Sequence, residues 1–124
     1  MAFKILICDD DDAVLSMLRF KLQKDNIGEV FTAQDGHQAL KQLQEQDFDL
    51  VITDIHMPYH DGGQVLNLIR VQQKKTTPVI MLSSDGEEEV IALAKKQGVN
   101  EFIKKPLKSA DEVASRAKKL LSMK

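Results

Sequence analysis

The sequence predicts an α/β protein in which five helices cover both faces of a five-stranded parallel sheet. Five short runs of apolar and β-branched residues, each typical of a strand buried on both faces, alternate with stretches whose apolar residues recur every three or four positions. Strands that alternate with helices in this way pair in parallel through right-handed crossovers. A chain of 124 residues suffices for one such unit, so we expect a single domain over residues 1–124.

The first half of the chain supplies three of the strands. They are predicted at Phe3–Cys8, Glu29–Ala33 and Leu50–Asp54. Helical spacing of apolar residues predicts the two helices between them, with inner faces of Val14, Leu15, Leu18 and Leu22, and of Ala39, Leu40 and Leu43. The first helix ends near Gly28, and Asp35 opens the second.

The second half continues the alternation. A third helix follows Asp61–Gly63, and its inward residues are Val65, Leu66, Leu68 and Ile69. The remaining strands are predicted at Pro78–Leu82 and Asn100–Lys104, where a proline is tolerated at a strand's first position.

Charges and caps define the last two helices. Glu87–Glu89 occupy the first turn and Lys95–Lys96 the last turn of the fourth helix, as the helix dipole favours, and Gly98 caps it. A capping box at Ser109–Glu112 opens the final helix, whose inner face carries Val113, Ala117, Leu120 and Leu121.

Acidic residues follow two of the predicted strands directly. Asp54 ends the third strand, where it could either begin a turn or do chemistry, because ligands of open α/β sheets bind outside the carboxyl ends of the strands. If the first and third strands are neighbours, Asp9 and Asp10 converge on Asp54. Carboxylates this close repel one another unless a cation joins them, and oxygen ligands suit Mg²⁺. Asp11 and Asp12 are interpreted as helix caps.

Composition excludes several classes of protein. A formal net charge of -2 gives no basic field, so direct nucleic-acid binding is disfavoured. No apolar run approaches the length of a membrane span and no signal-peptide pattern opens the chain, which predicts a cytoplasmic protein with no membrane contact. Cys8 lies inside an apolar strand, where a buried, unreactive thiol is expected.

The carboxyl ends of the predicted strands bring together acids, a hydroxyl and a cation. The residues are Asp9, Asp10, Asp54, Ser83 and Lys105. A carboxylate with a metal, a hydroxyl and a lysine around it is a plausible place to form an aspartyl phosphate, since cations neutralise charge on the transferring group.

Together these residues resemble the response-regulator receiver domains of two-component signalling, of the chemotaxis-regulator type. The resemblance covers essentially the whole chain and rests on motifs in order on the expected element ends: Asp9-Asp10, Gln34-Asp35-Gly36, Asp54 with Met57-Pro58 and Asp61-Gly62, Ser83, and Phe102-Ile103-Lys104-Lys105-Pro106. It implies a doubly wound, flavodoxin-like sheet of strand order 2-1-3-4-5.

The resemblance also implies roles for individual residues. Asp54 would accept a phosphoryl group from a histidine kinase or a phosphotransfer protein, and the chain would not otherwise be an enzyme. Mg²⁺, for which Mn²⁺ could substitute, would be held by Asp10, Asp54 and the backbone carbonyl of His56, with Asp9 acting through water. Lys105 would pair with the carboxylate and then the phosphate, and its bond to Pro106 would be cis.

Further roles concern the switch and the lifetime of the phosphate. The resemblance implies that Ser83 and Phe102 form a switch pair that alters a partner-binding face made by the fourth helix, the fifth strand and the fifth helix. His56 and Asp85 would flank the path of the hydrolytic water.

The sequence departs from the family pattern at two positions, and two other classes of protein have similar site residues. His60 and Ser84 stand where the family commonly has an apolar residue and Ala, which affects the choice of partner rather than the phosphorylation chemistry. A haloacid-dehalogenase-type phosphatase would need an acid where His56 stands. The serious alternative is a scaffold that binds partners without being phosphorylated, against which the intact set of site residues argues. A stand-alone regulator and a receiver within a longer protein remain equally open.

Overall fold

The computed structural model describes residues 3–84 and 86–122. Along these residues the elements are β1 (Phe3–Cys8), α1 (Asp12–Lys24), β2 (Gly28–Ala33), α2 (Gly36–Glu45), β3 (Leu50–Asp54), α3 (Gly62–Asn67), a π-helical segment η1 (Leu68–Gln72), β4 (Val79–Ser83), α4 (Glu88–Lys96), β5 (Glu101–Lys104) and α5 (Ala110–Ser122). The predicted alternation of strands and helices is therefore confirmed.

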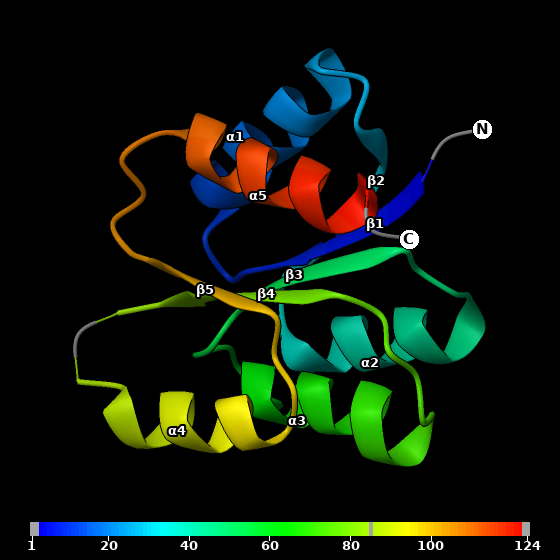
Figure 1. Cartoon of the computed structure of the whole chain (residues 1–124), viewed down its shortest axis with the longest axis vertical. Coiled ribbons are helices and arrows are strands. Elements are labelled where there is room, and N and C mark those ends of the chain that lie inside the picture. The colour runs from blue at the N-terminus through cyan, green and yellow to red at the C-terminus, as the bar shows by residue number, and fades with distance from the viewer. Residues whose placement is uncertain (1–2, 85, 123–124) are drawn as a thin grey trace.

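The strands form one parallel sheet in the order β2-β1-β3-β4-β5. Figure 1 shows α1 and α5 on one face of this sheet and α2, α3 and α4 on the other. The strand order is the one that the resemblance implied, with β1 and β3 as neighbours whose register pairs Cys8 with Thr53. Both strands consequently end at the same edge of the sheet.

Each face of the sheet has its own hydrophobic core. Alternate residues of a strand point to opposite faces, so Ile52 joins the core under α1 and α5 while Val51 joins the core under α2, α3 and α4. All five residues of β3 are buried, as are all five of β4. This double burial explains why their sequences are continuous apolar runs rather than alternating ones.

Buried polar groups are few in the sheet interior. Cys8 is fully buried, and burial raises the pKa of its thiol to about 12, partly countered by a hydrogen bond with Thr53. Cys8 is thus the inert buried thiol that was expected.

None of the described helices is long and apolar enough to cross a membrane.

The helix caps follow the sequence with one adjustment. Asp11 caps α1 by accepting a hydrogen bond of 2.9 Å from the backbone N–H of Ala13, as predicted. Ser109 caps α5 as predicted, but its hydroxyl accepts from the backbone N–H of Asp111 at 3.2 Å rather than from that of Glu112, which a capping box would use.

The end of the third helix differs from the prediction. Leu68 and Ile69 are buried as expected, but from Leu68 to Gln72 the helix has π geometry. A π segment adds a residue to the turn and re-aims the side chains that follow. Here it accompanies Arg70, whose guanidinium donates to the carbonyl oxygens of Lys75 and Gly98 and to the side chain of Asn100.

Replacing Arg70 with Met should lower the free energy of unfolding by about 1–2 kcal/mol, because the Gly98 and Lys75 carbonyl oxygens lose a charged donor in a half-buried setting. Denaturant unfolding measures the change. Arg19→Met removes the same charge from an exposed position of α1 and serves as the control, for which we expect a change within about 0.5 kcal/mol. Equal effects of the two substitutions would show that the Arg70 contacts contribute nothing.

Candidate functional site

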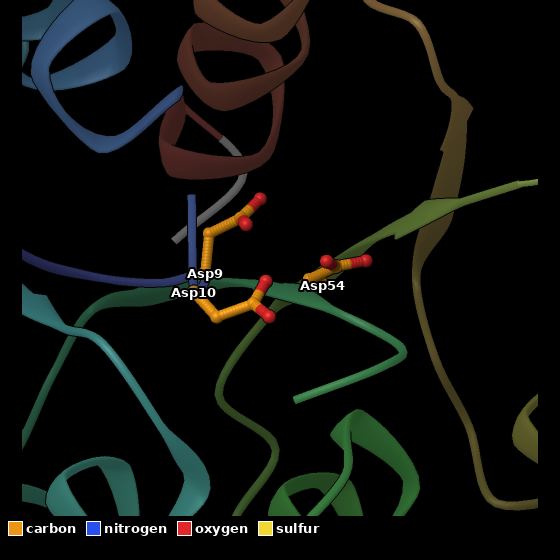
Figure 2. A group of neighbouring side chains, drawn as sticks. All are labelled: Asp9, Asp10 and Asp54. Atoms are coloured by element: carbon orange, nitrogen blue, oxygen red, sulfur yellow. The ribbon is translucent and has the colours of Figure 1, made fainter. Parts of the chain in front are cut away.

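Three carboxylates lie together at the carboxyl edge of the sheet. Asp9 and Asp10 follow β1 and Asp54 ends β3, and Figure 2 shows their side chains gathered at these strand ends. One oxygen from each lies within 4.8 Å of the others. Asp9 and Asp54 are buried whereas Asp10 is exposed, so the cluster opens to solvent on the Asp10 side.

Two hydrogen bonds with neighbouring backbone groups hold Asp9 in place. Its N–H donates to the carbonyl oxygen of Ala33 at 3.0 Å, which continues the pairing of β1 with β2. Its Oδ1 accepts from the N–H of Asp11 at 2.9 Å, which leaves Oδ2 turned toward the cluster. Asp9 and Asp10 belong to the cluster and Asp11 caps α1, as predicted. Asp12, predicted to be a second cap, is instead the first residue of α1, and its Oδ1 accepts from the side-chain amide of Gln34 at 2.6 Å.

Lys105 joins two of the carboxylates. Its Nζ lies 2.9 Å from Oδ2 of Asp9 and 3.0 Å from Oδ2 of Asp54. The residue is held in place by its backbone N–H, which donates to the carbonyl oxygen of Ser83 at 2.6 Å. The bond from Lys105 to Pro106 is cis, as the resemblance implied.

In this cluster burial and the contacts between Lys105 and the carboxylates shift the pKa values in opposite directions. Burial raises the pKa of Asp54, and the charge of Asp9 raises it further, although Lys105 acts in the opposite direction. Burial tends to lower the pKa of Lys105, but hydrogen bonds to Asp9 and Asp54 outweigh it and the pKa is raised. One lysine thus only partly compensates two buried carboxylates, and the cluster favours a further cation.

The chemistry of these side chains fits Mg²⁺. The three groups offer only carboxylate oxygens, which are hard ligands of the kind this ion prefers. Imidazole and thiolate ligands, which favour transition metals, are not part of the cluster found among the described residues. Solvent access beside Asp10 leaves room for the waters that Mg²⁺ normally retains.

Ser83 and Phe102 lie on the two strands that follow β3 across the sheet. Ser83 is buried at the end of β4, whose register places Asp54 opposite Leu82. Phe102, on β5, pairs with Met81 of β4 and is half-buried against the core under α2, α3 and α4. The predicted switch residues therefore occupy neighbouring strands, and Phe102 is turned at least partly inward.

The structure also reveals a residue that the sequence did not single out. Glu87, expected in the first turn of α4, instead precedes that helix and is only 5% exposed. Its Oε2 lies 2.7 Å from Nε2 of His56, one of the two residues that the resemblance places beside the path of the hydrolytic water. Asp85, the other residue assigned to the hydrolytic path, lies outside the described residues.

Comparison with known sequences gives a consistent family. A family model for the response regulator receiver domain matches residues 5–117. The chain is 35% identical over 118 residues to the alkaline phosphatase synthesis transcriptional regulatory protein PhoP of Bacillus subtilis, and 37% identical over 118 residues to the transcriptional regulatory protein ResD of the same organism. These alignments cover 95% of the chain and 48% of each relative, so the chain spans about half the length of the curated relatives it matches.

Solved structures agree with the sequence relatives. The receiver domain of the Francisella response regulator 1452 superposes with a TM-score of 0.86 at 33% identity, covering 98% of both chains. The chemotaxis response regulator CheY4 of Vibrio cholerae gives a TM-score of 0.86 at 30% identity, covering 97% of this chain and 99% of its own. From the strand order, the acid cluster with its lysine and these matches, the chain belongs to the response regulator receiver domain family of two-component signalling.

Proposed function

We propose that this receiver accepts a phosphoryl group on Asp54 and that residues 1–124 act as one phosphorylation-dependent unit. The observation that carries the proposal is the contact of Asp54 with Lys105 beside two further carboxylates at the sheet edge. A structural ion pair needs only one acid. One lysine does not compensate the negative charge of three acids until a second cation binds. Such uncompensated charge is typical of a functional site rather than of an ion pair that only stabilises the fold.

The proposed reaction is transfer from a phosphohistidine of a sensor kinase or a phosphotransfer protein. A carboxylate oxygen of Asp54 attacks phosphorus, the phosphorus–nitrogen bond breaks, and the imidazole of the donor keeps the electron pair. Lys105 neutralises charge beside the incoming group while its second contact, to Asp9, keeps its side chain oriented.

A divalent cation held by Asp10, Asp54 and the backbone carbonyl of His56, with Asp9 acting through water, would neutralise charge on the phosphoryl oxygens.

Ser83 and Phe102 are proposed to transmit the change. A phosphoryl group adds about -1.5 to -2 charges and three acceptor oxygens, so it can draw the Ser83 hydroxyl toward Asp54 as a donor. Phe102, half-buried already, would shift further inward. The face formed by α4, β5 and α5 would then change for an output partner. In this proposal the chain assists only its own phosphorylation and dephosphorylation.

Labelling with a small phosphodonor tests the assignment. Incubation with acetyl phosphate and Mg²⁺ or Mn²⁺ should add one phosphoryl group at Asp54, and excess chelator should reduce labelling to background, because an anionic donor is otherwise repelled by Asp9 and Asp10. Intact mass and phosphosite mapping measure both results. Labelling that is equally fast in chelator would contradict the metal dependence, and a phosphosite elsewhere would contradict the acceptor.

A further inference from the structure

Glu87 is a buried carboxylate on the loop that leads from Ser83 into α4. Only 5% of its surface is exposed, whereas the next two residues, Glu88 and Glu89, are exposed. Burying a carboxylate is costly unless hydrogen bonds offset the lost hydration. Specific partners must therefore hold the Glu87 side chain inward.

Two groups next to the phosphorylation site hold it. The backbone N–H of Ser84 donates to Oε1 of Glu87. Nε2 of His56 lies 2.7 Å from Oε2, a close polar contact. Among the described residues no group donates a hydrogen bond to Oε2, so the Ser84 N–H is the hydrogen-bond donor that holds this carboxylate. Glu87 thus bridges the loop after β3 and the loop after β4.

Both the Ser84 N–H and the His56 side chain belong to loops beside the place where a phosphoryl group would form. His56 is two residues after Asp54, and Ser84 directly follows Ser83, two residues beyond the strand partner of Asp54. A phosphoryl group there would repel the Glu87 carboxylate. It would also compete for backbone N–H groups, because its oxygens are strong, charged acceptors.

We propose that the Glu87 carboxylate is an internal competitor of the phosphoryl group on Asp54 for the Ser84 N–H, and that phosphorylation displaces it and moves the start of α4. This inference rests on the proposed function of Asp54. The path into the helix is short, because the carbonyl oxygen of Glu87 accepts the N–H of Ile91 at 2.9 Å. Glu87 acts here as a positioning residue.

Beryllofluoride, a phosphoryl mimic, tests the competition without an unstable product. The full chain is titrated with it in Mg²⁺ as wild type, Glu87→Gln and Glu88→Gln, the last removing the same charge from the adjacent exposed residue. Glu87→Gln should bind about fivefold to tenfold more tightly, because a carboxamide is the weaker acceptor for the Ser84 N–H and does not repel the mimic. Glu88→Gln should change affinity less than about twofold, as surface charges are screened.

NMR spectra of the same samples give a readout that a purely structural role would not produce. In wild type, the mimic should shift the backbone amide signals of Ser84 and of 88–91. In Glu87→Gln these signals should lie part of the way to their bound positions before the mimic is added. Glu87→Asp keeps the charge on a shorter side chain, so its affinity for beryllofluoride should lie between those of wild type and Glu87→Gln. If thermal unfolding shows that Glu87→Gln does not fold, Glu87→Asp replaces it in the test.

The outcomes separate the two proposals. Unchanged or weaker binding by folded Glu87→Gln, or by folded Glu87→Asp in its place, overturns the competition. Signals of 88–91 that stay fixed when wild type binds the mimic also overturn it. Failure of every protein, wild type included, to bind the mimic overturns the assignment of Asp54 and, with it, this inference.

Discussion

Asp54→Asn should lose phosphoryl labelling while its free energy of unfolding stays the same or rises. The neutral carboxamide cannot attack phosphorus, so incorporation from acetyl phosphate should fall to background. The stability effect follows from the raised pKa of Asp54: a carboxyl group whose pKa is higher in the folded state stabilises the fold only when protonated, and ionised at neutral pH it destabilises the fold. Removing this charge therefore relieves the cluster.

The two measurements together exclude a trivial explanation. A protein that loses labelling but unfolds at the same or higher denaturant concentration has lost a reacting group, not its fold. Asp12→Asn is the matched control, because Asp12 is an exposed acid of the same run and lies outside the cluster. It should label as wild type does. Wild-type stoichiometry in Asp54→Asn would remove Asp54 from the reaction.

Gly36→Ala should lower the free energy of unfolding by about 1–3 kcal/mol, corresponding to a fall in Tm of roughly 5–15 °C. A Cβ at Gly36 would stand 2.0 Å from the carbonyl oxygen of His60 and 2.6 Å from its carbonyl carbon. These are backbone atoms and cannot rotate away. The segment 58–60 must move, which also breaks the hydrogen bond of 3.1 Å from the Gly36 N–H to the carbonyl oxygen of Pro58.

Calorimetry or denaturant unfolding measures this loss, and Gly63→Ala provides the control. The nearest atom to a Cβ at Gly63 is a side-chain oxygen of Asp61 at 3.2 Å, which can adjust. We expect Gly63→Ala to change the free energy of unfolding by less than about 0.5 kcal/mol. If Gly36→Ala is equally mild, the approach of the two loops at Gly36 is not a constraint on the fold.

Sequence predicted the sheet well because its signals are local. Runs such as Leu50–Ile52 are apolar throughout, which is the pattern of a strand covered on both faces, and the acids of the site lie at or directly after the ends of such strands. The predicted boundaries were wrong by one residue for β2, which begins at Gly28, for both ends of β4, which spans Val79–Ser83, and for β5, which begins at Glu101. Strand ends carry no apolar signal, so small errors of this kind are expected.

The features that sequence missed depend on distant contacts. Glu87 fits the first turn of a helix so well by charge that nothing indicated its burial, and its partner His56 lies far away in the chain. The π segment at Leu68–Gln72 escaped notice because buried Leu68 and Ile69 suit an α-helix equally well. Arg70 offered a possible clue, since a lone arginine beside two buried positions invites a search for carbonyl partners.

The two contacts of Lys105 have a consequence for when the site comes into existence. They join residues 96 and 51 positions apart in the chain, so they can form only after the final crossover has docked β5 against β4. Closing such long loops is slow relative to forming local helices. The site should therefore become able to accept a phosphoryl group only late in folding. A phosphorylated chain would then be one in which β5 has already joined the sheet.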